Sequence, residues 1–332
     1  MKLIEISPDE VGSALLRTQL ADIHAVVRGA ELSPDNTLNF VEPRESLLLD
    51  AAAQLGIPVF NIRIGVPTID VVADAKDRFL ISAPDKTSEL LAWYQLADWL
   101  HRKWAGKHLL LDLTTLSGSS IFQLHAAAIK AACVGISYLY TTPIKYPQVD
   151  KPDDIPPLVT RSIKQPHGYR SFAHEQSAGS RKHIIVLGFD RHRPNKFIEH
   201  YQWPTEEVHV ILGTPAYVGG GEEQARLSLG PIYHELDKIK HVHTVDPKLP
   251  AQNGETPGVA DLLQKLTTDE DIIDLVPLGP KPTLLGCLMY WHGLSDERKE
   301  RTRFLFDFPI MRQVRTEGVG VTWLYRDVLS AD

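Results

Sequence analysis

The sequence has few cysteines and no long hydrophobic run. Only two of its 332 residues are cysteines, Cys133 and Cys287, which is too few for a zinc site built on thiolates. Both lie in apolar helical stretches, as buried thiols of a reducing cytosol do. No run of about 18 apolar residues occurs, so no membrane span is expected. The first residues, MKLIEISPDEVGS, do not resemble a secretory signal, and we expect a cytoplasmic protein.

An excess of positive charge is also missing. The net charge is −7 and the isoelectric point is about 6.1, which argues against non-specific binding of duplex nucleic acid. The chain is 43% hydrophobic and 23% charged, close to an average globular protein. Its length is sufficient for two ordinary domains.

Two segments of the chain resemble each other. LLLDLTTLSGSSIFQLHAAAIKA begins at Leu109, and DIIDLVPLGPKPTLLGCLMYW begins at Asp271. Each has a short apolar run, an Asp-Leu pair (Asp112 and Asp274), a turn of small residues or proline, and an apolar helical stretch. This pattern indicates the strand–turn–helix joint of a parallel α/β sheet, where anionic ligands commonly bind. Two copies favour a duplicated architecture.

The rest of the chain supports this fold class. Strands are predicted from Asp22, Pro58, Arg78, His108 and Gly135, and again from His183, Val208, His241, Asp271 and Arg303, with GVGVTWLYRDV as a last strand at an edge. Helices are predicted from Pro43, Lys86, Arg193, Glu222, Gly258 and Pro282. We expect an α/β protein with duplicated Rossmann-like parallel sheets and helices on both faces. The predicted divisions are residues 1–145, a connecting segment 146–180, and residues 181–332.

The turn from Leu278 to Thr283 gives the strongest site signal. Gly279 lets the backbone approach a ligand, Lys281 adds a positive charge, and Thr283 opens the next helix. The spacing is neither a dinucleotide fingerprint nor a Walker loop. The matching turn in the first half offers the hydroxyls of Ser117 and Ser119, which suit either an anion cradle or a helix cap.

Two loops of the second half complete the candidate ligand site. Asp190, Arg191, Arg193 and Asn195 follow the first strand of that half, where arginine suits bidentate contact with phosphate; a solvated charged turn is the alternative. Tyr217, in a loop ahead of three glycines, is placed to stack on a base.

Metal and covalent chemistry have little support. His241 and His243 share one face of a strand, but no further ligand with diagnostic spacing appears, so no metal and no cofactor is expected. Neither a GxSxG elbow nor an HEXXH motif occurs, and no catalytic residue is assigned.

The turn Leu278-Gly279-Pro280-Lys281-Pro282, between a strand and an apolar helix, resembles the Gly-Thr-Lys-Pro-Met type segment of CRISPR-associated Rossmann-fold (CARF) domains. HIIVLGFD from His183 resembles their first strand and loop, and two such units in one chain are similar to the SAVED arrangement. Here Pro280 replaces the usual threonine, and Thr283 replaces an apolar residue. The resemblance implies binding of cyclic oligonucleotides by residues 190–195, by Gly279, Lys281 and Thr283, and by Ser117 to Ser120 as the first-half equivalents.

Three functions remain open. The leading hypothesis is a sensor or regulatory subunit that binds a nucleotide or cyclic oligonucleotide, of the kind used in prokaryotic antiviral defence. The second is an enzyme acting on a phosphorylated small molecule, with Asp190, Asp274 or Asp112 as acid or base. The third is a scaffold subunit with a protein partner or a second copy of itself.

Overall fold

In a computed structural model, the chain forms two compact units. The first contains Met1–Ile144 and Gly318–Asp332, and the second contains Lys145–Glu317. The structure describes residues 1–29, 43–64, 78–85, 87–144, 163–169, 179–188, 192–217, 241–251, 257–309 and 318–330. Within these ranges, no helix has the length and apolar character needed to cross a membrane.

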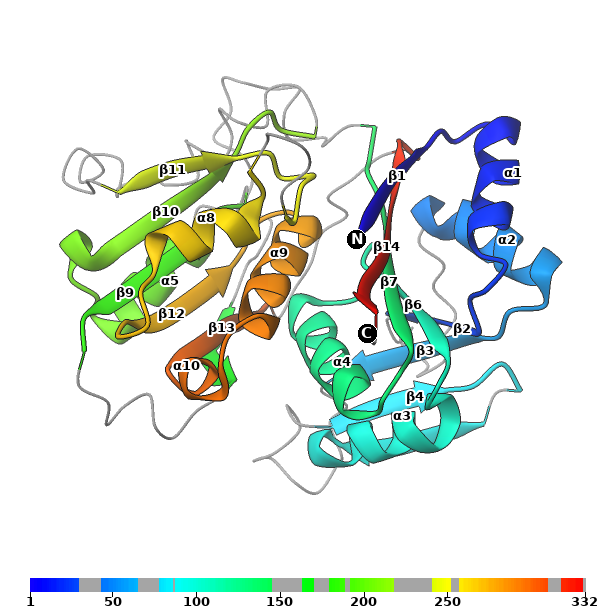
Figure 1. The fold of residues 1–332 in the computed structure, drawn as a ribbon, viewed down its shortest axis with the longest axis horizontal. Helices are drawn as coiled ribbons and strands as arrows, with labels where there is room; N and C mark the ends of the chain where they lie inside the picture. The colour runs from blue at the N-terminus through cyan, green and yellow to red at the C-terminus, as the bar shows by residue number, and fades with distance from the viewer. Residues whose placement is uncertain are drawn as a thin grey trace. The chain divides into compact units, whose positions relative to one another are not determined.

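The first unit is built on an eight-stranded sheet in the order β1-β14-β7-β6-β2-β3-β4-β5 (Figure 1). The strands are Lys2–Ile6 (β1), Ala25–Gly29 (β2), Val59–Ile64 (β3), Arg78–Ser82 (β4), Ser88–Ala92 (β5), His108–Asp112 (β6), Gly135–Thr141 (β7) and Thr322–Ser330 (β14). The four central strands β7, β6, β2 and β3 are parallel to one another, and antiparallel strands extend the sheet at both sides.

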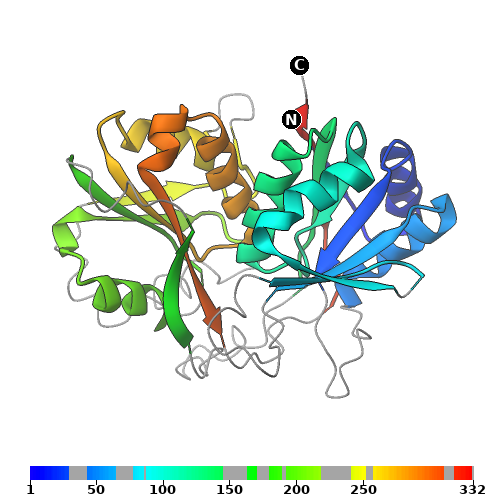
Figure 2. The same cartoon turned by 90° about the horizontal axis from the view of Figure 1, so that it is seen from below.

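Helices cover both faces of this sheet (Figure 2). They are Glu10–Gln19 (α1), Ser46–Leu55 (α2), Leu96–Trp104 (α3) and Gly118–Lys130 (α4). Helices α1 and α2 pack onto one face through a core that includes Leu16, Leu48, Val26 and Leu110, while α3 and α4 lie side by side on the other. Helix α1 begins where the Asp9 carboxylate accepts the Gly12 N–H, a standard N-cap.

The second unit has a six-stranded sheet in the order β11-β10-β9-β12-β13-β8. The strands are Ile163–Tyr169 (β8), Arg181–Val186 (β9), Val208–Gly213 (β10), Val242–Val245 (β11), Ile272–Pro277 (β12) and Thr302–Pro309 (β13). All are parallel except β8, which pairs antiparallel with β13. Helix α5 (His192–Tyr201) packs Phe197 into the core of one face. Helices α8 (Val259–Leu266) and α9 (Lys281–His292) pack together on the other face, and α10 is Asp296–Glu300.

The predicted fold class is confirmed, because two parallel-rich sheets each carry helices on both faces. Several details differ from the expectation. The tail strand β14 is not at an edge: it lies between β1 and β7, inside the first unit rather than in the 181–332 division. The connecting segment 146–180 contributes β8 to the second sheet. Residues 88–92, expected to begin a helix, form strand β5.

The internal resemblance holds for topology better than for residue alignment. Asp112 is the last residue of β6, whereas Asp274 lies in the middle of β12. The strands predicted from Arg78 and His241 run in opposite senses: β4 is antiparallel to β3, whereas β11 is parallel to β10. Each unit nevertheless repeats the same central arrangement, with β2, β3, β6 and β7 matching β9, β10, β12 and β13.

The two sheets are completed by exchanged strands. After β7, the chain continues to β8, which pairs with β13 of the second sheet. After β13, it continues to β14, which pairs with β7 of the first sheet. Both exchanged strands are antiparallel to their partners. The second unit therefore contains β8, which follows β7 of the first unit in the chain. The first unit contains β14, which follows β13 of the second unit.

Candidate functional site

The central strands of the second sheet form a topological switch point. Strand β9 leads through α5 to β10 on one side, and the neighbouring strand β12 leads through α9 to β13 on the other side. In open α/β sheets, ligands bind outside the carboxyl ends of the strands at such a point. The predicted segments after residues 186 and 277 thus follow neighbouring strands at one edge of the sheet.

The backbones of these two segments touch. A Cβ added to Gly188 would lie 2.2 Å from the carbonyl oxygen of Leu278, and a Cβ on Gly279 would lie 2.7 Å from Thr283 Oγ1 and 3.0 Å from the Leu187 oxygen. Glycine is therefore required at both positions by close approach. The edge at the switch point consists of backbone atoms from two turns held against each other.

The start of α9 is hydrogen-bonded internally. The buried Thr283 hydroxyl donates to the Pro280 carbonyl oxygen at 2.7 Å, and the Thr283 N–H donates to the same oxygen at 2.9 Å. Pro282 has no N–H to offer. Two of the first three positions of the helix thus offer no N–H to an anion, which leaves Lys281 as the main predicted contact of this turn. Thr283 holds the turn together.

Arg193, in the first turn of α5, is committed to a carboxylate of its own unit. Its Nε and Nη2 donate to the two oxygens of Asp307 at 2.6 and 2.5 Å. Asn195 lies two residues further along the same helix, and its Oδ1 is buried without a hydrogen-bond partner in the described part of the chain. Asp190 and Arg191 lie outside the described residues.

Tyr217 lies in the segment that follows β10, the next strand of the sheet after β9. Its hydroxyl donates to the Pro247 carbonyl oxygen at 3.0 Å. The peptide bond between Thr214 and Pro215 is cis. Tyr217, Gly188 and Gly279 therefore each follow one of three neighbouring strands, β10, β9 and β12.

The first unit repeats the switch point between β2 and β6. A Cβ on Gly29 would lie 2.4 Å from the Thr115 carbonyl oxygen, and the Gly29 N–H donates to Thr115 Oγ1. Asp112 accepts hydrogen bonds from the Thr114 N–H and the Thr115 hydroxyl at 2.9 and 2.7 Å. Asp112 is fully buried, and its role is to hold this turn.

Ser117 and Ser119 belong to the cap of α4. The Ser117 oxygen accepts the Ser120 N–H at 3.2 Å and lies 2.7 Å from the Ser120 hydroxyl, while Ser119 is buried with its Oγ 3.2 Å from that of Ser117. The sequence allows either an anion cradle or a helix cap at these serines, and the contacts are those of a helix cap. The first-unit turn is therefore a weaker candidate for a ligand.

A buried ionic cluster in the first unit was not foreseen. Arg28, at the end of β2, donates to Asn61 Oδ1 at 2.6 Å and to Glu45 Oε2 at 2.7 Å, and both charged side chains are almost fully buried. The one available signal was a lone arginine in the otherwise apolar run AVVRG. Buried charge of this kind is retained only with close partners.

One constellation has the connectivity of a serine-hydrolase triad. His108 Nε2 lies 2.9 Å from Ser137 Oγ, and His108 Nδ1 lies 3.2 Å from Asp22 Oδ2. Arg326 from β14 holds the same Asp22 carboxylate at 2.6 and 2.8 Å, which lowers its pKa to about 2. Ser137 is fully buried, so no substrate carbonyl reaches its oxygen. The cluster joins strands rather than performing acyl transfer.

Asp274 is likewise enclosed by partners. Its oxygens lie 3.0 Å from His183 Nδ1 and 2.8 Å from Arg303 Nε, and the carboxylate is 1% exposed. The His183 ring stacks on Trp203 at 4.2 Å. Neither Asp112 nor Asp274 is placed to act as an acid or base on a ligand.

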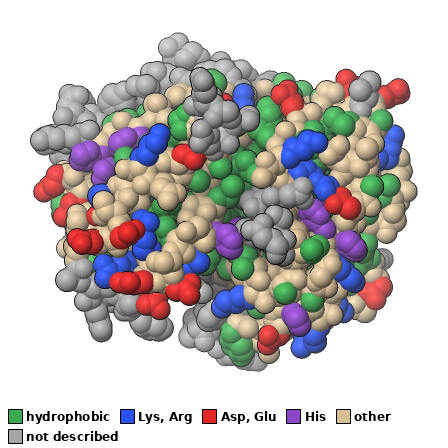
Figure 3. Space-filling view, in the orientation of Figure 1, with side chains coloured by type: hydrophobic (Ala, Val, Ile, Leu, Met, Phe, Trp, Pro, Cys, Tyr) green, Lys and Arg blue, Asp and Glu red, His purple; other side chains and the backbone are tan. Residues whose placement is uncertain are grey.

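Histidines gather on the part of the second unit that carries β10 and β11 (Figure 3). His209 stacks on His241 with ring centres 4.4 Å apart, and His209 Nδ1 lies 3.4 Å from His243 Nε2. Burial and the neighbouring histidines lower the pKa of His209 to about 4. Among the described residues, no group of three or more His, Cys, Asp or Glu side chains is arranged to hold a metal ion.

The switch point of the second sheet thus has tight backbone turns at its base, with Lys281, Arg193 and Asn195 on the two helices that leave it. Comparisons with protein-family models, curated proteins and solved structures found no match to the chain, so its function is argued from this site.

Proposed function

We propose that this protein binds a nucleotide or cyclic oligonucleotide through its phosphates at the carboxyl-end edge of the second sheet. The observation that carries the proposal is the topological switch point between β9 and β12, where the segments that follow the two strands meet at the carboxyl-end edge of the sheet and lead into α5 and α9. Parallel sheets of this topology bind ligands at this edge.

Charge supports the same position. Lys281 opens α9, in a protein whose net charge is −7. A cationic side chain at one edge of an acidic protein attracts an anionic ligand to that edge.

A binding function is favoured over catalysis because the carboxylates of Asp112 and Asp274 are bonded to residues of their own units. Asp112 and Asp274 hold their own turn and strands, and Ser137 is buried. We therefore infer a sensor or regulatory subunit, cytoplasmic, of the kind used in prokaryotic antiviral defence, whose bound ligand is the signal.

The test is calorimetric titration of the purified protein with a panel of cyclic dinucleotides, cyclic tri- and tetra-adenylates, and mononucleotides. Lys281→Ala should weaken the binding of the preferred compound about tenfold or more, corresponding to loss of one charge-assisted phosphate contact. The matched control is Lys265→Ala, because Lys265 is an exposed lysine at the far end of α8. Equal affinities for the Lys281 variant and the wild type would refute the site. Chromatography of the mixtures after incubation shows whether any compound is consumed, which would favour an enzyme.

A further inference from the structure

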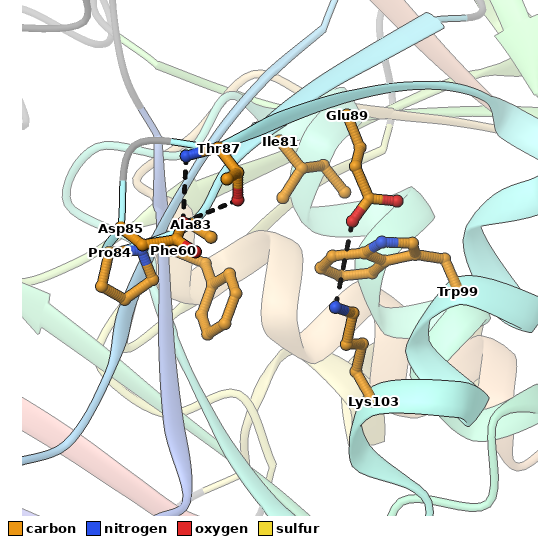
Figure 4. A pocket seen from close by; sticks show the side chains of 9 residues that line it. All are labelled: Phe60, Ile81, Ala83, Pro84, Asp85, Thr87, Glu89, Trp99 and Lys103. Carbon is orange, nitrogen blue, oxygen red and sulfur yellow. Dashed lines mark hydrogen bonds and ion pairs between the residues drawn. The ribbon is translucent and has the colours of Figure 1, made fainter.

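A pocket in the first unit lies well away in sequence from the switch point. It has a volume of about 360 Å³ and is formed by strands β3, β4 and β5 together with helix α3. Its walls are Phe60, Ile81, Ala83, Pro84, Asp85, Thr87, Glu89, Trp99 and Lys103 (Figure 4). Its volume falls within the range typical of sites for small molecules.

The interior of the pocket is apolar and aromatic. Phe60 packs edge-on against Trp99 and Trp104, with ring centres 6.2 and 4.8 Å apart, and Trp99 packs edge-on against Trp104 at 4.9 Å. Trp99 and Ile81 are almost fully buried. These rings are held in place by their neighbours, so the pocket presents a fixed surface to a hydrophobic group.

The mouth carries charges of both signs. Lys103 Nζ lies 3.9 Å from Glu89 Oε1, and half of each side chain is exposed. Such a loose, exposed pair stabilises a protein very little, so a ligand can replace either partner at low cost. The Lys103 ammonium also lies 6.0 Å from the centre of the Trp99 ring, and the dashed line in Figure 4 marks its ion pair with Glu89.

A second carboxylate is fixed at the same mouth. Asp85 Oδ1 accepts the Thr87 N–H at 2.9 Å and the Thr87 hydroxyl at 2.6 Å. These hydrogen bonds lower the pKa of Asp85, so the group stays negatively charged. The pocket therefore offers one cation, two anions and an apolar interior within a few side chains of each other.

One buried donor in the wall lacks an acceptor. The indole Nε1 of Trp99 has no hydrogen-bond partner within the described ranges, although Trp99 is only 2% exposed. Unsatisfied buried N–H groups are uncommon in proteins.

We propose that this pocket binds a free amino acid with an apolar or aromatic side chain. The ligand's carboxylate pairs with Lys103 and its ammonium group pairs with Glu89. Its side chain packs on Phe60, Ile81 and Trp99. A zwitterion whose two charges are attached to one carbon matches the closely spaced opposite charges of the mouth. This site is separate from the nucleotide proposal and stands or falls independently of it.

The test compares L-phenylalanine with its methyl ester, which lacks the carboxylate, and with N-acetyl-L-phenylalanine, which lacks the ammonium group. Binding to the full chain is followed by ligand-observed NMR and calorimetry. We expect L-phenylalanine to bind at least tenfold more tightly than either derivative, because each derivative loses one ionic contact. If L-phenylalanine does not bind, or if either derivative binds as tightly, the proposal is wrong.

Two exposed substitutions separate the roles of the charges. Lys103→Met should weaken L-phenylalanine and N-acetyl-L-phenylalanine but leave the ester unchanged. Glu89→Gln should weaken L-phenylalanine and the ester but leave the acetylated compound unchanged. Asp98→Asn, at an exposed position of the same helix, is the control and should change none of the affinities. Equal effects of both variants on all three compounds would overturn the assignment.

Discussion

Arg193 and Asp307 form a bidentate ion pair that connects the first turn of α5 to strand β13, with Nε–Oδ2 and Nη2–Oδ1 distances of 2.6 and 2.5 Å. The Asp307 carboxylate is 1% exposed and the Arg193 side chain 19%. In the first unit, Arg44, just before α2, donates to the Thr141 carbonyl oxygen at the end of β7. In the second unit, an arginine in the segment after β9 therefore bonds to β13, which lies on the far side of β12. In the first unit, an arginine in the segment after β2 bonds to β7, which lies on the far side of β6.

Asp307→Asn should lower the free energy of unfolding by about 3 kcal/mol, because it leaves the partly buried Arg193 without its counter-charge. Urea titration followed by tryptophan fluorescence measures this change. Asp269→Asn is the matched control, since Asp269 pairs with Arg298 at 3.1 Å while being 87% exposed. The control should cost less than about 1 kcal/mol. Equal losses of unfolding free energy in the two variants would show that the buried pair stabilises the protein no more than the exposed one.

Gly188→Ala should destabilise the second unit by about 1–3 kcal/mol, because the new Cβ would lie 2.2 Å from the Leu278 oxygen and force the two turns apart. It should also abolish nucleotide binding if the proposed site is correct. Gly293→Ala is the comparison, since its nearest neighbours would be at an ordinary 3.6 Å. Thermal unfolding of both variants gives the comparison. A Gly188 variant as stable as the Gly293 variant would contradict the close contact.

Protonation of His209 should destabilise the protein in acid. Its pKa is lowered from 6.5 to about 4 by burial and by His241, His243 and Lys182, with Asp271 acting in the opposite direction. The folded state keeps the ring neutral while the unfolded chain takes up a proton. Stability is therefore lost as the pH falls from about 6.5 to 4, by no more than about 3 kcal/mol.

Urea titrations at pH 7 and pH 4.5 measure this loss. His209→Gln should make the difference between the two pH values smaller, whereas His200→Gln, at an exposed position on α5, should leave it as in the wild type. An unchanged pH dependence in the His209 variant would assign the acid sensitivity to other groups.

Deletion of residues 318–332 should disrupt the first unit, although they lie at the far end of the chain. The deletion removes β14, which separates β1 from β7, and with it the Arg326 hydrogen bonds to Asp22. Hydrogen–deuterium exchange should show lost protection in β7 and β6 and retained protection in β9 and β12. Full protection of β7 in the shortened chain would contradict this strand order.

Sequence patterns predicted most of the elements because their apolar periodicity is strong, as in β6, β9, β12 and the helices α4 and α9. Strand β5 was missed because Leu90 and Leu91 continue without a break into the amphipathic pattern of α3. The turn at Asp85 and Thr87 connects β4 and β5 as a hairpin, and it gave no clear signal in the sequence. Strand β8 contains Pro166 and Gly168, which disfavour a strand in the sequence and are tolerated at the edge of a sheet.

The candidate site was predictable in part. The position of Gly279 and Lys281 in the turn after β12 was predicted, because a turn after an apolar strand has local signatures. The partner of Arg193 was not, since Asp307 is more than a hundred residues away and no local pattern connects them. The sheet to which β14 belongs was unpredictable for the same reason, because strand pairing depends on backbone hydrogen bonds that any apolar strand can make.

The exchange of β8 and β14 has a consequence for synthesis of the protein on the ribosome. A domain usually folds once its own segment has left the exit tunnel. Here all the parallel strands of the first sheet are made early, and β7 can pair with β6 at once. Its second neighbour, β14, is made only when residues 322–330 emerge. The amino-terminal unit can therefore complete its sheet only after the second unit has been made, and until then the exposed edge of β7 needs protection from other chains.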